Sequence, residues 1–369
     1  MKKDVPSSND RLGKVGGEAV LEGVMMKSGD RCATACRLEN GGITVSEQRF
    51  VSVRTKNKIL NLPLIRGVVN FVEMMKLSMR SLNVSADALG LNAEEEEGRF
   101  EKWLKKHLGL KLTDAIMVIA AVLGVALAVF LFMYLPALAA RGIDTLTGGA
   151  THRFFTLIEG AVKILIFIGY IYLVSLLPDI RRTFAYHGAE HKSIACYERG
   201  DELTPENAKK HTRFHPRCGT SFMFVMILIG IIVGFFIPAS LPTYLRALFK
   251  LLLLPVVVGV GYEFIMYAGK HNNVLVRILS APGLWMQRLT TREPDLSQLE
   301  VAITALKCAM PDVFPDFDTS GLTVRNLDTG EVRQPLSDTA NDGEAVNEPQ
   351  KEAETAVATE ETETPHDET

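Results

Sequence analysis

The sequence lacks several features that would place it in a common protein class. Its first residues, MKKDVPSSNDRLGKVGG, are basic but have no apolar segment behind them, so we expect no cleaved signal peptide. Neither the G-x-G-x-x-G nor the G-x-x-x-x-G-K-[ST] spacing occurs, so nucleotide binding has no specific support. No internal repeat is evident, which gives no support to an inverted-repeat transporter. Lysines and arginines lie near apolar segments without interleaved aromatics, which favours lipid over nucleic acid as a partner.

Long apolar runs are the clearest feature that is present. A spanning helix needs about 20 apolar residues, and four stretches meet this requirement, at roughly 115–138, 155–177, 220–240 and 245–268. The sequence therefore predicts an α-helical polytopic membrane protein with about four transmembrane helices.

Positive charge between the runs predicts the orientation. Eight Lys or Arg lie between the second and third runs, within residues 178–219. An excess of Lys and Arg marks the cytoplasmic side, so we expect a multi-pass inner-membrane protein with this loop and both termini in the cytoplasm. The five cysteines, an odd number, then all face a reducing compartment, and no structural disulfide is expected: Cys32, Cys36, Cys196, Cys218 and Cys308.

The segment before the first run divides into three parts. Residues 1–14 are expected to be a flexible N-terminus, and residues 15–57 alternate apolar and polar side chains around a turn at Asn40-Gly41-Gly42, which predicts a small β-rich cytoplasmic unit. Residues 58–112 are predicted to form amphipathic and charged helices at the membrane surface. The alternative for the amphipathic helix is that it packs on the β-rich unit.

The region after the fourth run divides in two. Residues 269–315 are predicted to form a cytoplasmic helical segment, with apolar side chains on one face of its last helix. Residues 316–369 are predicted to be an acidic disordered tail, because residues 338–369 hold eleven Asp or Glu and one Lys with few apolar groups.

The stretch AYHGAEHKS within residues 178–219 carries the residues best suited to chemistry. In H-x-x-E-H, His187 and His191 lie one helical turn apart, so both imidazoles can bind one ion, and Glu190 beside them can act as a general base. The same loop contains His215 and Cys218, which Pro216 places on an extended or turn segment. Two ligands on each side predict a site for a divalent metal such as Zn²⁺.

Two functions from different classes fit this pattern. Three protein ligands with Glu190 beside an open position would make a metal-dependent hydrolase at the cytoplasmic membrane face. Four protein ligands would make a structural site in a scaffold or assembly factor. A third interpretation is that the motif is only a solvated helix start.

Acidic residues inside the predicted spans need partners. Glu263 could ligate the metal, accept a hydrogen bond from a ligating imidazole, snorkel to water, or pair with Lys270 or Arg277. Glu159 is expected to pair with Lys163, four residues further along the same helix.

Five ordered motifs together resemble the YqhQ-like bacterial membrane proteins, a family of unknown function described as predicted metal-dependent enzymes: GGEAVLEGVMMKSGD, LPLIRGVVNFVEMMKLS, AYHGAEHKSIACYE, HPRCGTSF and PGLWMQRLTTREPDLSQLEVAI. The resemblance covers roughly residues 15–310. It implies a metal site formed by five residues, His187, Glu190, His191, His215 and Cys218. It also implies a functional role for Glu22 and Arg66.

Overall fold

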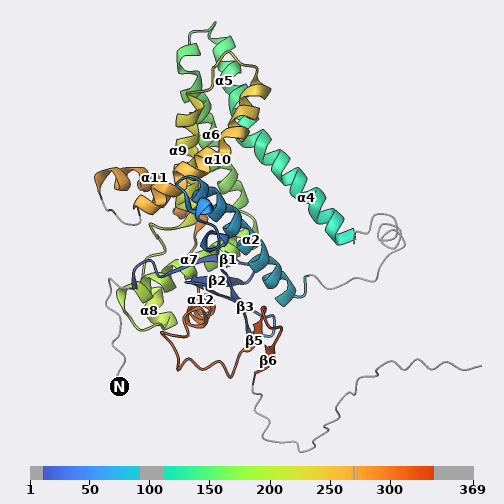
Figure 1. Cartoon of the computed structure of the whole chain (residues 1–369), viewed down its shortest axis with the longest axis vertical. Helices are drawn as coiled ribbons and strands as arrows, with labels where there is room; N and C mark the ends of the chain where they lie inside the picture. Colours follow the sequence, from blue (N-terminus) through green and yellow to red (C-terminus); the bar gives the residue numbers. More distant parts are fainter. Residues whose placement is uncertain (1–10, 92–111, 269–270, 272, 336–369) are drawn as a thin grey trace, which may run out of the picture. The chain divides into compact units, whose positions relative to one another are not determined.

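The computed structural model describes residues 11–91, 112–268, 271 and 273–335 (Figure 1). The charged helix predicted before the first span and most of the predicted acidic tail lie outside the described residues, as do all but a few residues of the N-terminal segment.

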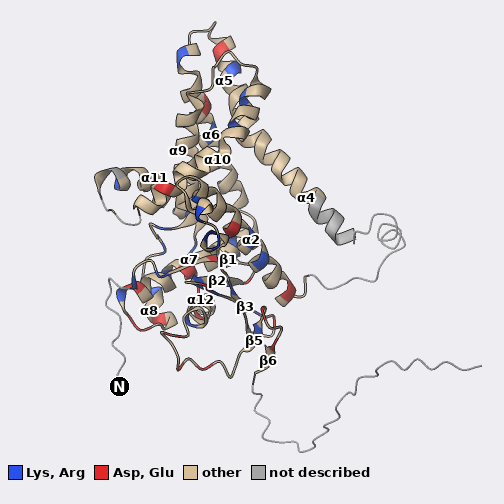
Figure 2. Ribbon diagram, in the orientation of Figure 1, with Lys and Arg blue, Asp and Glu red and all other residues tan. Residues whose placement is uncertain are grey.

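Three described helical stretches are long and apolar enough to cross a membrane: Ile119–Leu146, His152–Val174 and Thr243–Ala268. The first combines α4 (Leu112–Val129), a π-helical turn (Phe130–Tyr134) and α5 (Leu135–Leu146). The other two contain α6 (Phe155–Val174) and α10 (Thr243–Ala268). These helices carry few charged residues in Figure 2. The prediction of a mainly helical membrane protein is confirmed.

The run predicted as the third span forms a shorter helix. This helix, α9, covers Gly219–Gly234 and has 16 residues, fewer than the roughly 20 that a spanning helix needs. It is apolar throughout and packs against α10 and α11 (Val274–Thr290). Among the described residues there are thus three long apolar helices and one shorter apolar helix.

A six-stranded sheet, ordered β1-β2-β3-β4-β5-β6, confirms the predicted N-terminal β unit. Its first four strands are antiparallel neighbours: β1 (Val15–Val20), β2 (Gly23–Ser28), β3 (Arg31–Arg37) and β4 (Ile43–Arg49). The predicted turn joins β3 to β4, and Gly41 there has φ +84°, a conformation that glycine adopts without strain.

Part of the segment predicted as an acidic tail belongs to this sheet. Strand β5 (Thr323–Asn326) pairs parallel to β4, and β6 (Val332–Arg333) pairs with β5. The acidic residues counted in the sequence lie after these strands. Composition therefore did not indicate that residues 323–333 extend the N-terminal sheet beyond β4.

Helices cover both faces of the sheet because its strands alternate apolar side chains to each side. One face packs against α7 (Pro178–Arg199) and α12 (Leu296–Ala309) through a core that includes Val24, Met26 and Leu299. The short helix α8 (Pro205–Lys209), capped by Thr204, packs against α7 and α12. The other face, with Cys32 and Cys36 as packing residues, meets Leu77 of α2 (Ile65–Ala88).

Helix α2 buries several polar side chains and exposes several apolar ones. Glu73, Ser81 and Ser85 are buried, whereas a row of apolar side chains is 39% to 58% exposed: Ile65, Phe71, Val72, Met75, Met79 and Leu82. The start of α2 crosses α10 closely, since a Cβ added to Gly67 would lie 3.0 Å from Gly259 Cα. Helix α2 therefore packs on the sheet and also presents an apolar face, so both sequence interpretations describe part of it.

The structure gives Glu263 and Glu159 partners that the sequence analysis did not name. Glu263 pairs with Arg66 of α2, where Arg66 Nε lies 2.7 Å from Glu263 Oε1. Glu159 pairs with Arg246, 2.8 Å from Oε2, and with Lys250, both on α10. The partners of both carboxylates come from neighbouring helices. A pattern within one segment of the sequence does not reveal such partners.

Candidate metal centre

Helix α7 supplies the H-x-x-E-H residues. Pro178 stands in its first turn, and Gly200 with φ +85° terminates it, the usual arrangement of proline and glycine at helix ends. Residues 178–199, predicted as part of a cytoplasmic loop, are therefore one continuous helix. His187 and His191 lie one turn apart on it, and their ring centroids are 4.4 Å apart.

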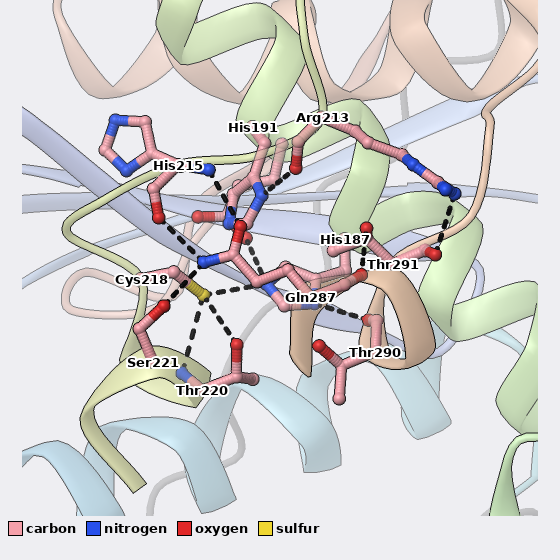
Figure 3. A network of polar contacts seen from close by, with 11 residues as sticks. His187, His191, Arg213, His215, Cys218, Thr220, Ser221, Gln287, Thr290 and Thr291 are labelled. Carbon is pink, nitrogen blue, oxygen red and sulfur yellow. Dashed lines mark hydrogen bonds and ion pairs between the residues drawn. The ribbon is translucent and has the colours of Figure 1, made fainter. Parts of the chain in front are cut away.

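Backbone carbonyls fix both imidazoles in one tautomer. His187 Nδ1 donates to Thr290 O at 2.9 Å, and His191 Nδ1 donates to Arg213 O at 2.6 Å (Figure 3). In the neutral form of each ring, Nε2 is then the unprotonated nitrogen and can act as a ligand. Burial is the main cause that lowers the pKa of His191, which keeps this imidazole neutral.

Cys218 brings the third donor from a distant part of the sequence. It is the N-cap residue of α9, where its Sγ accepts a hydrogen bond from Thr220 N at 3.4 Å. Its sulfur lies 3.2 Å from His187 Nε2. One donor atom each from His187, His191 and Cys218 lies within 4.8 Å of the others, so the three side chains could hold a metal ion.

A buried nitrogen without a hydrogen-bond partner indicates that these residues suit a metal ion. Among the described side chains, His191 Nε2 is buried and has no hydrogen-bond partner. Burying a polar atom without a partner costs about 1–3 kcal/mol, and a metal ion would satisfy this nitrogen. Two imidazoles and a thiolate are donors that Zn²⁺ accepts, so the residues fit the group.

Glu190 lies beside the three donors in a water-poor environment. Only 5% of its surface is exposed, and its Oε2 is 3.9 Å from His187 Nε2. Burial raises the pKa of Glu190 to about 6, although the His187 charge and a hydrogen bond from the Gly17 N–H act in the opposite direction. A carboxyl with this pKa can take and return a proton near neutral pH.

His215, the remaining predicted ligand, lies beside this group. Its ring centroid is 5.5 Å from that of His191, and its Nε2 is 3.7 Å from Glu198 Oε2. Figure 3 shows its ring directed away from Cys218. Burial raises the pKa of Glu198, but its contact with His215, a hydrogen bond from the Gly13 N–H and the Arg217 charge together lower it to about 2. His215 thus faces a carboxylate that stays ionised.

The two other residues implied by the resemblance have structural contacts. Glu22 has φ +49° at the turn between β1 and β2, and its carboxylate pairs with Arg182 and accepts from Tyr186 Oη at 3.3 Å. It therefore ties the sheet to α7. Arg66 ties α2 to α10 through Glu263.

The end of α11 supports the site, and the sequence alone did not indicate this role. Gln287, fully buried, accepts from His215 N at 2.8 Å and donates to His215 O at 2.7 Å. Thr290 O orients His187, and Arg213 donates to Thr291 O at 2.9 Å. Gln287, Thr290 and Thr291 lie in the motif PGLWMQRLTTREPD. Apart from this motif, the sequence did not indicate their role, because a supporting amide or carbonyl has no recognisable spacing.

Gly188 allows α7 to approach this segment. A Cβ at position 188 would lie 2.0 Å from Arg292 O, a backbone atom that cannot rotate away. We expect Gly188→Ala to push α7 from residues 290–292, to break the His187–Thr290 hydrogen bond and to weaken metal binding by 10- to 100-fold, as for other changes to groups that orient a ligand. Competition with a fluorescent zinc chelator measures this. Gly16→Ala is the matched control, because its Cβ meets nothing within 4 Å; equal affinity in both variants would contradict the expectation.

A cavity of about 820 Å³ adjoins two of the three donors, His187 and Cys218. It is bounded by β1, α2, α7 and the start of α9, and its lining includes His187, Glu190, His215 and Cys218. Its volume lies in the range of about 300–1,000 Å³ that is usual for ligand sites. A molecule could therefore reach Glu190 and the His/His/Cys group together.

These features define a helical protein with three helices able to cross a membrane and a three-donor group that could hold a metal ion. Comparison with known proteins then gives the family. Residues 62–312 match the family model described as "Protein of unknown function (DUF1385)", and the chain belongs to this family. It is 36% identical over 299 residues to "Uncharacterized protein YqhQ" of Bacillus subtilis (strain 168), which covers 78% of this chain and 89% of that protein. No solved structure matches the chain.

Proposed function

We propose that this protein is a metal-dependent hydrolase that acts at the cytoplasmic face of the bacterial inner membrane. The main observation in support is that His187, His191 and Cys218 lie close together, with the buried Glu190 beside them. Three donors leave a tetrahedral ion one open position, which is the arrangement of catalytic zinc, whereas a structural site has four protein ligands. The three-donor set therefore favours the hydrolase over a scaffold clamped by metal.

Each residue then has a role. His187, His191 and Cys218 would hold the ion, which supplies a Lewis acid that polarises the bond to be cleaved. Glu190 accepts the proton of the attacking water and returns it to the leaving group. Gln287 and Thr290 keep His215 and His187 in position through the hydrogen bonds described above. The surrounding burial excludes bulk water, which strengthens these interactions.

The cytoplasmic placement follows from charge. The eight Lys and Arg of residues 178–219 lie on α7, on α8 and in the segment leading to α9, and such an excess marks the cytoplasmic side of a membrane protein. The site residues lie in the same part of the chain, so substrate would reach them from the cytoplasm or from the inner leaflet.

Glu190→Gln tests the assignment of the general base. The amide keeps the side-chain volume but cannot accept a proton, so hydrolysis should fall by about 10²- to 10⁴-fold. Because Glu190 is not assigned as a ligand, the metal content of the purified protein should equal that of the parent. Chromogenic amide, ester and phosphoester probes measure turnover, and mass spectrometry measures metal. A fully active variant would remove Glu190 from the mechanism.

The pH profile supplies a second readout. Since burial raises the pKa of Glu190 to about 6, the base is protonated and inactive below this pH and ionised above it. Turnover should therefore rise with pH through about 6 and then level off. Residual turnover of Glu190→Gln should lack this rise. A parent profile that is flat between pH 5 and 7 would contradict the role.

A further inference from the structure

The cavity beside the candidate metal centre runs along a strand edge. Its lining includes every residue from Gly13 to Ala19, together with His187, Glu190 and Cys218. Seven successive residues of one strand and its approach can line a cavity only if that strand borders it lengthwise. Strand β1 is the first strand of the sheet, and β2 is its neighbour on one side.

The outward backbone groups of β1 face this cavity. Val20 and Gly23 pair across the two-residue turn that joins β1 to β2, so this pair faces inward and Gly17, three residues earlier, faces away from β2. Successive residues of an antiparallel strand alternate between facing the partner and facing away, and Val15 and Ala19 therefore share the direction of Gly17. The strand thus presents peptide groups in a row that passes the candidate base.

Glycines keep the edge open. A Cβ at Gly16 would meet nothing within 4 Å, so the cavity is unfilled at this position. A Cβ at Gly17 would lie 3.1 Å from Glu190 Cγ and would crowd the base. The adjacent Glu18 has a buried carboxylate oxygen, Oε1, with no hydrogen-bond partner among the described groups.

We propose that the substrate is an extended polypeptide segment that pairs with the free edge of β1. This proposal rests on the proposed hydrolase and names its substrate class. Addition of a strand to an exposed sheet edge is a recurring mode of peptide recognition, in which main-chain hydrogen bonds supply affinity. The six residues of β1 offer about 20 Å of edge at about 3.3 Å per residue, enough for a segment of similar length.

The reaction at this position is amide hydrolysis. The oxygen of water bonds to the carbonyl carbon of the peptide, and the C–N bond breaks. Glu190 takes a proton from the water and delivers it to the departing nitrogen, so the products are a carboxylic acid and an amine. The pairing with β1 would place the cleaved bond beside Glu190, because the Gly17 N–H already lies at this carboxylate.

A second hollow meets the first at the candidate centre. It has a volume of about 870 Å³, its lining is shared among α9, α10 and α11, and it has Arg217 and Cys218 in common with the first cavity. Its side chains are mainly apolar, such as Phe222, Phe264 and Ile278. This second hollow would accept the apolar part of either a polypeptide or a lipid. The row of peptide groups on β1 favours the polypeptide. Hydrolysis of a lipid ester is therefore an alternative outcome of the test.

The experiment measures retention of peptides, separately from catalysis. The probe is a mixture of decapeptides with randomised side chains, because pairing with an edge depends on the main chain. Full-length Glu190→Gln protein, loaded with Zn²⁺ in phosphatidylglycerol nanodiscs, is immobilised, and retained peptides are quantified by mass spectrometry. The control is the same mixture N-methylated at alternate residues, which lacks the main-chain N–H donors at those positions. We expect at least tenfold greater retention of the unmethylated peptides.

Proline at the edge gives an independent arm. Ala19→Pro removes one outward N–H, and a strand already has the extended conformation that proline requires of the preceding residue. In the Glu190→Gln background it should lower retention at least tenfold with unchanged metal content. The control is Val332→Pro, on the opposite edge of the sheet, where the side chain is 46% exposed. If Ala19→Pro does not fold, the comparison of methylated and unmethylated peptides still tests the proposal, because it uses protein with an unaltered β1.

The outcomes separate the two proposals. Equal retention of methylated and unmethylated peptides, or hydrolysis of phosphatidylglycerol by the metal-loaded parent without peptide cleavage, would overturn the polypeptide substrate and leave the hydrolase standing. Absence of metal in the parent, or full activity of Glu190→Gln, would overturn the hydrolase itself.

Discussion

Replacing His191 with alanine should leave the purified protein nearly free of metal. This imidazole is 1% exposed, its Nδ1 is committed to Arg213 O, and its buried Nε2 has no hydrogen-bond partner among the described groups. The substitution removes one of three donors. Changes to groups that merely orient a ligand cost about 10- to 100-fold in affinity, so removal of the ligand should cost at least 100-fold.

Metal per chain, measured by inductively coupled plasma mass spectrometry after dialysis, checks this result. His152→Ala is the matched control, because His152 is exposed and lies 3.3 Å from Asp144 on another part of the chain. Cobalt substitution adds a spectroscopic test, since a charge-transfer band from the Cys218 thiolate should vanish in Cys218→Ala. Parental metal content in His191→Ala, with the fold intact, would reduce the H-x-x-E-H motif to a solvated helix start.

Replacing Glu159 with glutamine should strongly destabilise the protein. Glu159, Arg246 and Lys250 are 2%, 0% and 9% exposed, and the carboxylate contacts both cations. Removing one member of a buried ion cluster leaves uncompensated charge, which costs about 3–5 kcal/mol. Arg246 keeps hydrogen bonds to the carbonyls of Ile237 and Pro238, but these do not neutralise it.

Unfolding in detergent micelles, followed by circular dichroism, measures the loss. Glu300→Gln is the matched control, because Glu300 pairs with Arg37 at the surface and such a pair contributes about 1 kcal/mol or less. Combining Glu159→Gln with Arg246→Met and Lys250→Met should recover most of the stability, since no charge is then left unpaired. A loss below about 1 kcal/mol for Glu159→Gln alone would show that the cluster is hydrated.

The sequence predicted those parts of the structure that depend on local pattern. Apolar runs located the long helices, and the alternation around Asn40-Gly41-Gly42 located β3 and β4. The spacing of His187 and His191, with the nearby Cys218, located the three donors that the structure brings together. In each case the signal lies within about 30 consecutive residues.

Features that depend on packing between distant segments could not be predicted. Gln287 and Thr290 act through a side-chain amide and a backbone carbonyl, and neither has a characteristic spacing. The partners of Glu159 and Glu263 come from other helices, so any acid with a nearby base looked plausible. Helix α9 begins next to the predicted start of the third run but ends at Gly234 rather than near residue 240, and hydropathy does not indicate this end.

The composition of the sheet has a consequence for synthesis of the protein. Strands β1–β4 come from the start of the chain, β5 and β6 follow residue 320, and the three long helices are made between them. The Cys218-bearing helix and the α11 segment that positions His187 are also made late. The last strands of this unit therefore leave the ribosome only after the described long helices, so the sheet beside the candidate metal centre is completed late in synthesis.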